Sequence, residues 1–218
     1  MKGIPSITTA DAYVDHVGKV TRNDPGRRAA LRRSLGRPVA DIGARWAHGV
    51  VAPWLPERRD VRGRRVYDAV ESAYYTVAAL AAARPADRDR ETDQPATPEA
   101  DAAADNEESA RTNLGRVLGL AVRDGKVNPD TAEGRLHLLC RQDVAGLHRQ
   151  LPGLIRLLQA KDVQVDLAKL LLDLSRWGIG RDEVAKQWLQ GFYRAMNELK
   201  DNDDQDAARQ IGQESEDK

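Results

Sequence analysis

The chain has 218 residues, of which 41% are hydrophobic and only 5% aromatic, with a single Phe. This length can bury a substantial core, and abundant Ala, Leu and Arg with few aromatics favours helices over a β-sandwich or barrel. No apolar run approaches the roughly 18 residues of a membrane span, and no apolar segment follows Lys2 as in a signal peptide. The only cysteine, Cys140, cannot form an internal disulfide and is compatible with a reducing compartment, so we expect a cytoplasmic protein. The composition predicts that its fold is all-α.

The formal net charge of zero hides a strong segregation of charge along the chain. Residues 1–84 carry 15 basic and 8 acidic side chains, and residues 111–200 carry 15 and 10. Residues 85–110 carry 2 basic and 9 acidic side chains, and residues 201–218 carry 2 and 7. We therefore predict an N-terminal helical region, an acidic linker, a C-terminal helical bundle and an acidic tail. The basic regions indicate a phosphate-rich partner.

Two helices are predicted at the start of the N-terminal region. Thr8 or Thr9 can cap a first helix that runs to about Thr21. Asp24-Pro25 then begins a second helix, because Asp suits the cap and Pro the first helical position, and Gly36 suits its end. No nearby carboxylate can pair with the arginines of this second helix, which are Arg27, Arg28, Arg32 and Arg33.

A short third helical segment is expected to place Val39, Ile42 and Trp46 on one apolar face. A fourth helix is predicted from about Gly63 to Ala83. It follows a second cluster of arginines, which comprises Arg58, Arg59, Arg62, Arg64 and Arg65.

The acidic segment 85–110 contains no apolar side chain larger than Ala. Such a segment cannot bury enough surface to offset the entropy lost on ordering, so we predict a disordered linker. The predicted fold is thus all-α, with two small helical bundles joined by this acidic linker. The acidic tail 201–218 is expected to be mobile.

The most informative stretch of the second half is Gly134–Leu158. Its apolar residues recur at steps of three and four, which is the spacing of one helix face. Asp143 should cap a new helix and so divide the stretch in two, and Pro152 should kink the second piece. The basic residues between the apolar positions are Arg135, Arg141, Arg149 and Arg156.

Two further boundaries are predicted in the second half. Asn128-Pro129 marks the start of the helix that carries Gly134–Leu158. Residues 166–177 and Asp182–Leu199 also have helical spacing and are expected to be separated at Gly178 and Gly180.

No pattern in the chain indicates catalysis or metal binding. None of the four histidines belongs to an HExxH pair, one cysteine provides no zinc spacing, and no phosphate-binding glycine loop occurs. His137 and His148 are expected on helix flanks or the surface, and paired carboxylates are confined to linker and tail, where nothing should hold them in place. Structural roles are expected for all the tryptophans, Trp46, Trp54, Trp177 and Trp188. We therefore expect a non-enzyme without cofactor or metal, whose arginines bind nucleic-acid backbone irrespective of sequence.

Five segments occur in an order and spacing that characterise one family: ALRRSLGRP, LGRVLG, GRLHLLCRQDVAGLHRQL, VDLAKLLLDLSRWG and VAKQWLQGFYRAM. Over residues 25–197 the chain resembles the CasB family, the small subunit of the type I-E CRISPR Cascade complex. The resemblance implies a non-enzymatic helical protein of antiviral defence, present in two copies. It would contact the guide-RNA-bearing backbone subunits and the large subunit, and would hold displaced or target DNA on a basic surface, which stabilises the R-loop.

The resemblance also implies a set of basic nucleic-acid contacts. The matching positions are Arg33 with its neighbour Arg32, Arg64 or Arg65, Arg116, Arg135, Arg141 and Arg181. Where members often carry arginine, this chain has Pro152-Gly153, which leaves Arg149 or Arg156 as substitutes. Two alternatives stay open: a helical adaptor whose basic faces dock acidic proteins, and a free-standing regulator that prefers one duplex sequence.

Overall fold

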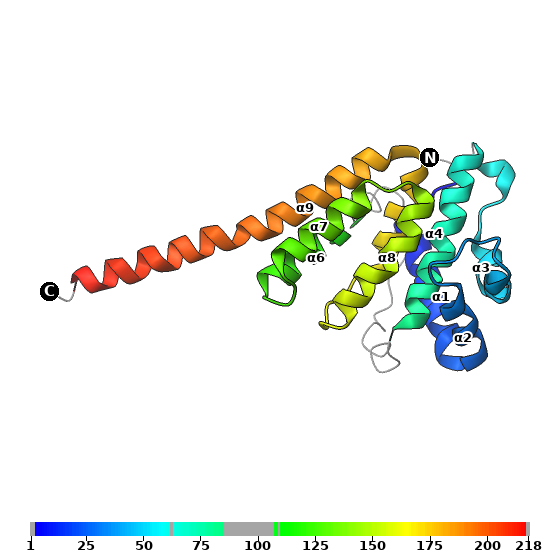
Figure 1. Cartoon of the computed structure of the whole chain (residues 1–218), viewed down its shortest axis with the longest axis horizontal. Helices are drawn as coiled ribbons and strands as arrows, with labels where there is room; N and C mark the ends of the chain where they lie inside the picture. Colours follow the sequence, from blue (N-terminus) through cyan, green and yellow to red (C-terminus); the bar gives the residue numbers. More distant parts are fainter. Residues whose placement is uncertain (1–2, 62, 85–106, 109, 217–218) are drawn as a thin grey trace.

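All regular secondary structure of the described residues in the computed structural model is helical (Figure 1). The structure describes residues 3–61, 63–84, 107–108 and 110–216, with the backbone alone at residues 42, 43 and 60 and from residue 199 onward. The predicted all-α fold is therefore confirmed. The disorder predicted for the acidic linker falls largely on residues 85–106, which lie outside the described residues.

Helices α1 (Ile7–Asn23) and α2 (Pro25–Ser34) begin at capping side chains. The cap of α1 is Ser6, whose Oγ accepts a hydrogen bond from the Thr9 N–H at 3.2 Å, so this helix begins earlier than predicted. The cap of α2 is Asp24, as predicted, with 2.9 Å between its carboxylate and the Arg27 N–H. The same carboxylate lies 3.2 Å from Arg27 Nε, so the expectation that no carboxylate can pair with the arginines of this helix is wrong for Arg27. Gly36 follows the end of α2 with φ of +74°, which glycine adopts without strain.

The expected apolar role of Trp46 is wrong, because its side chain is 63% exposed. It lies in η1 (Ile42–Ala47), a 3₁₀ helix with three residues per turn, so Ala44 and Ala47 share the buried face and Trp46 does not. The elements that follow are α3 (His48–Val51), η2 (Ala52–Trp54), η3 (Arg58–Asp60) and α4 (Arg64–Ala83).

The second half contains α6 (Leu114–Arg123), α7 (Pro129–Cys140), α8 (Val144–Gln159) and α9 (Leu167–Glu216). Asn128 and Asp143 cap α7 and α8 as predicted, accepting hydrogen bonds from Thr131 N–H at 3.1 Å and Gly146 N–H at 2.7 Å. Helix α8 continues on both sides of Pro152.

The predicted ends around α9 need two corrections. Only Gly180 leaves helical geometry, with φ of −137° and ψ of 46°, whereas Gly178 stays helical. A Cβ at Gly178 would lie 2.6 Å from Ala69 Cβ and 2.9 Å from the Arg65 carbonyl, so this glycine permits close packing on α4 rather than ending a helix. The helix also continues past residue 199 to Glu216, where a mobile tail was expected.

The helices of both halves share one hydrophobic core. Before Gly180, α9 packs along α4 and α1, and after it α9 packs along α6 (Figure 1). Buried residues from both regions, such as Tyr74 and Leu171, belong to the same apolar cluster. Among the described residues, no helix combines the length and the hydropathy that a membrane span requires.

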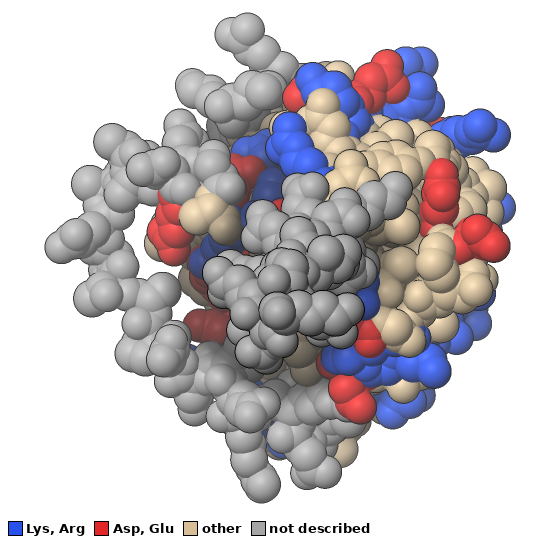
Figure 2. Space-filling view, turned by 90° about the vertical axis from the view of Figure 1, so that its left-hand side faces the viewer, with Lys and Arg blue, Asp and Glu red and all other residues tan. Residues whose placement is uncertain are grey.

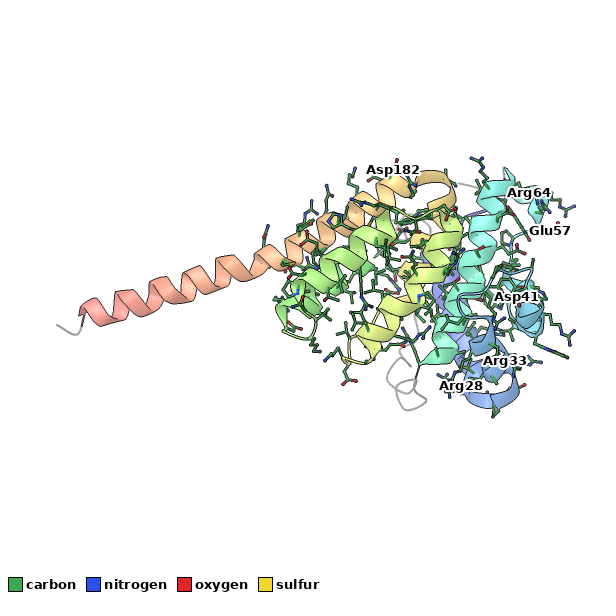
Figure 3. The ribbon with its side chains drawn as sticks, in the orientation of Figure 1. Arg28, Arg33, Asp41, Glu57, Arg64 and Asp182 are labelled. Atoms are coloured by element: carbon green, nitrogen blue, oxygen red, sulfur yellow. The ribbon has the colours of Figure 1, made fainter. Side chains whose placement is uncertain are left out.

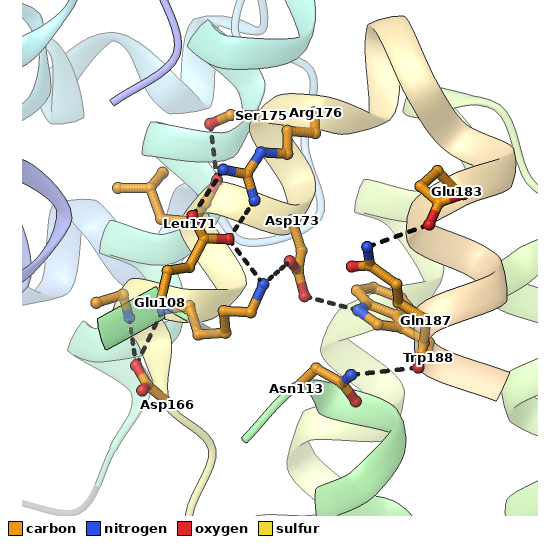
Figure 4. A network of polar contacts seen from close by, with 12 residues as sticks. Glu108, Asn113, Asp166, Leu171, Asp173, Ser175, Arg176, Glu183, Gln187 and Trp188 are labelled. Atoms are coloured by element: carbon orange, nitrogen blue, oxygen red, sulfur yellow. Dashed lines mark hydrogen bonds and ion pairs between the residues drawn. The ribbon is translucent and has the colours of Figure 1, made fainter. Parts of the chain in front are cut away.

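The end of the acidic segment is held on α9 by a buried polar network (Figure 4). Glu108 accepts hydrogen bonds from Lys169 Nζ at 3.1 Å and from Arg176 Nη2 at 2.7 Å. Lys169 also donates to Asp173 at 2.7 Å, and the Trp188 indole N–H donates to the other Asp173 oxygen at 2.7 Å. The hydrogen bond from Arg176 lowers the pKa of Glu108 to about 2.

This network corrects the expectation that nothing holds the carboxylates of the acidic segment. Glu107 and Glu108 are helical, so described backbone begins inside the range predicted as linker. Arg111 adds a second anchor, with ion pairs to Asp11 of α1 at 2.6 Å and to Asp166 at 3.2 Å.

Candidate nucleic-acid interface

A hollow bordered by predicted site residues lies where the two helical regions meet. We call it the first groove; its volume is about 930 Å³, and its walls come from the loop after α2, from α4, from the start of α8 and from the Gly180 break of α9. The cationic residues that line it are Arg37, Arg65, Arg149 and Arg181. The fold therefore brings together two predicted contacts, Arg65 and Arg181, from opposite halves of the chain.

The arginines that line the first groove differ in whether a carboxylate forms an ion pair with them. Arg37 lies 3.4 Å from Asp41, and Arg181 lies 3.1 Å from Asp182. Arg65 and Arg149 are exposed and form no ion pair with any described residue. These two guanidinium groups are thus the available anion-binding groups of the groove.

The lining of the first groove is mixed in charge rather than uniformly basic. Its carboxylates are Asp68, Glu71, Asp143, Asp182 and Glu183. Several are already engaged, since Asp143 caps α8 and Glu183 lies 2.7 Å from Lys186. Burial raises the pKa of Glu71. The positive charge of the groove that no described carboxylate pairs with is therefore concentrated at Arg65 and Arg149.

His148 lines the first groove as a buried residue, not at the surface as predicted. Its Nδ1 shares a 2.8 Å hydrogen bond with Thr76 Oγ1, and its Nε2 has no hydrogen-bond partner among the described residues. Burial lowers its pKa to about 4, so the ring is neutral at neutral pH and adds no charge to the groove.

A second groove of about 610 Å³ lies between α7 and α9. It contains Arg141, a predicted contact, together with Lys186 and Arg194, which the sequence interpretation missed. Lys186 and Arg194 are eight residues apart on α9, so they share a face of that helix, away from buried Trp188 and Phe192. Their spacing in the sequence could have indicated that Lys186 and Arg194 lie on one face of a helix.

The other predicted contacts lie outside both grooves. Arg116 is held within the molecule, because its guanidinium donates to both Glu198 oxygens, at 2.8 and 3.2 Å. Arg64 is 82% exposed and lies 3.8 Å from Asp68. Arg135 on α7 and the pair Arg32 and Arg33 on α2 are exposed, and no described residue forms an ion pair with them.

The basic residues therefore form several groups rather than one patch. In Figure 3, Arg64 and Asp182 lie along the upper edge of the helical body, whereas Arg28 and Arg33 lie at its lower edge. Figure 2 shows basic side chains in separate groups on the face it presents, with acidic and uncharged surface between them. Within the described part of the chain, no three His, Cys, Asp or Glu residues are grouped to hold a metal ion.

The solved structures that resemble this fold include the following three. A chain of a "CRISPR RNA-guided surveillance complex" is 37% identical, with 90% of this chain and 98% of that chain covered and a TM-score of 0.71. A chain of a "CRISPR RNA-guided surveillance complex, pre-nicking" has the same identity and coverage and a TM-score of 0.72. The crystal structure of M. ruber CasB is 22% identical to this chain, with a TM-score of 0.64. The match covers 88% of this chain and 96% of that chain.

No curated protein matches the chain in a sequence search. Residues 27–193 match a family model described as CRISPR-associated protein Cse2. That match covers well over half of the chain and includes four of the five segments on which the resemblance to CasB rests, together with residues 184–193 of the fifth. The resemblance is therefore confirmed, and this chain belongs to the CRISPR-associated Cse2 family.

Proposed function

We propose that the chain is a non-catalytic subunit of a CRISPR RNA-guided surveillance complex and stabilises the R-loop by binding nucleic-acid backbone. Family membership and the 37% identity to chains of two such complexes support the subunit role. The observation that carries the nucleic-acid role is the pair Arg65 and Arg149, exposed beside one groove and free of ion pairs with described residues.

Arginine on a helical surface suits this role because its planar fork donates two hydrogen bonds to one phosphate and stays charged at any physiological pH. Such contacts hold a strand in place without reading its bases. The proposed ligands are the displaced and the target DNA strands. The proposed protein partners are the backbone subunits that carry the guide RNA, the large subunit and a second copy of this chain, in the cytoplasm.

Salt dependence tests the nucleic-acid role. Each phosphate neutralised on a single strand contributes roughly −0.7 to the slope of log K against log salt, so about five contacts predict a slope near −3.5. In the double variant Arg65→Gln/Arg149→Gln, two contacts are lost and the slope should become shallower by about 1.4. Fluorescence anisotropy of a labelled single-stranded oligonucleotide over a salt series measures this.

The matched control is Arg123→Gln, an arginine of α6 that lines neither groove and pairs with Asp124 at 3.1 Å. It should leave the slope unchanged. Binding by the wild-type chain that does not vary with salt would contradict the nucleic-acid role.

The second candidate function is an adaptor that docks acidic proteins. It is favoured by exposed apolar side chains near the second groove, since Leu138 is 49% exposed and Tyr193 39%. The double variant Arg135→Glu/Arg141→Glu separates the two functions. Loss of DNA retention with intact assembly of the complex supports strand binding, whereas loss of assembly supports the adaptor. A free-standing regulator would instead prefer one duplex sequence over random duplex.

A further inference from the structure

Trp46 is the most exposed large apolar side chain of the described residues. The fold does not require its indole, because Ala44 and Ala47, at 1% and 0% exposure, seat η1 on the core. The other tryptophans are used structurally: Trp177 and Trp188 are buried against each other, and Trp54 packs on Tyr13. A single exposed apolar residue is ordinary on a protein surface, so its meaning depends on its surroundings.

Those surroundings are cationic. The Arg45 guanidinium lies 4.8 Å from the centre of the Trp46 ring, a cation–π contact that orients both side chains. No described carboxylate forms an ion pair with Arg45. Helix α2, which packs directly on η1, exposes Arg32 and Arg33 near its C-terminal end, also without ion pairs to described residues. The exposed ring thus lies against one guanidinium, on an element that packs on the helix carrying two more, and no described carboxylate forms an ion pair with any of the three.

We infer that Trp46 is a stacking platform for an unpaired nucleobase of a single strand, with Arg45, Arg32 and Arg33 binding the adjacent phosphates. Exposed aromatic rings combined with basic residues are how proteins hold single strands without reading sequence. A duplex offers no free base face to the ring, and an acidic protein surface would use the arginines but not the indole. The inference rests on the proposed nucleic-acid role and gives it a defined contact in η1.

The test uses the full chain and a thymidine oligonucleotide. Loss of one base stack weakens single-strand binding by about five- to 150-fold, so Trp46→Ala should lower affinity within this range. Trp46→Phe keeps a ring and should restore part of the affinity. The slope of log K against log salt should stay the same in both, because no phosphate contact is removed. Tryptophan fluorescence of the wild type should be quenched by the strand, and this quenching should be largely absent in Trp46→Ala.

Two controls make the result specific. Leu138→Ala removes another exposed apolar side chain and should not change affinity, and an abasic oligonucleotide should bind wild type and Trp46→Ala equally. The stacking inference is overturned if Trp46→Ala binds the thymidine strand as tightly as wild type, or if it impairs only assembly with protein subunits. Either result leaves the salt-dependent backbone binding intact, whereas absence of salt dependence in the wild type removes the proposed function itself.

Discussion

The burial of His148 makes the stability of the fold depend on pH. Its pKa is lowered to about 4 in the folded chain, against an ordinary value of 6.5. Between these values the unfolded chain binds the proton more strongly than the folded chain does. The contribution of neutral His148 is therefore present above pH 6.5 and is lost as the pH falls toward 4.

We expect the free energy of unfolding to fall by up to about 3 kcal/mol from this residue when the pH is lowered from 7.5 to 4. Urea denaturation over that pH range measures it. His148→Gln should show a weaker pH dependence than the wild type. An unchanged pH profile in His148→Gln would contradict the assignment.

At the scale of single residues, the sequence shows which side chains are charged, but it did not predict correctly which side chains are buried. Trp46 and His148 were both misplaced, the first as buried and the second as a flank or surface residue. Helical spacing predicts a face only if the helix type is known, and η1 has three residues per turn rather than 3.6. His148 follows Leu147 on an apolar face that is wider than the stripe predicted from the sequence, because α4 packs against α8.

At the scale of elements, the packing of α6 on α9 depends on glycine. A Cβ at Gly115 would lie 1.8 Å from the Trp188 carbonyl oxygen, and one at Gly119 would lie 2.6 Å from that of Phe192. These separations are far below van der Waals contact, so a larger residue would force the two helices apart.

We therefore expect Gly115→Ala to destabilise the fold by about 3 kcal/mol or more, since overpacking at a backbone contact cannot be relieved by a side-chain rotation. Gly134→Ala is the matched control, because nothing lies within 4 Å of its Cβ position on α7. That change should stabilise by about 0.5–1 kcal/mol through helix propensity. Thermal unfolding followed by circular dichroism measures both, and equal effects would disprove the packing argument.

The helix starts show what local sequence can predict. The caps Asp24, Asn128 and Asp143 were all identified correctly, since a cap is a contact between neighbours in the chain. Gly178 was misinterpreted for the opposite reason. Its role is contact with Ala69 and Arg65 of α4, which no local pattern reveals.

At the scale of the whole molecule, Glu108 anchors the end of the acidic segment to α9. We expect Glu108→Gln to destabilise the chain by roughly 2 kcal/mol, because Lys169, 9% exposed, loses one of its two carboxylate partners. Glu107→Gln removes an exposed carboxylate 3.5 Å from Arg111 and should cost less than about 0.5 kcal/mol. Chemical denaturation at pH 7 compares the two variants.

The effect of Glu108 should also depend on pH with a defined sign. Its pKa is lowered from 4.5 to about 2 by hydrogen bonds from Arg176 and Lys169, so its contribution is full above pH 4.5 and is lost as the pH falls toward 2. The stability difference between wild type and Glu108→Gln should therefore shrink on acidification. A difference that grows at low pH would contradict this role.

The sequence alone determined the helical class, most helix starts and the segregation of charge, because these depend on neighbours along the chain. Only the tertiary structure decided which arginines are available. Arg116 is paired with Glu198, 82 residues away, whereas Arg65 and Arg149 meet at one groove from opposite halves. A guanidinium is free or occupied according to the elements packed beside it, and helical periodicity describes one element at a time.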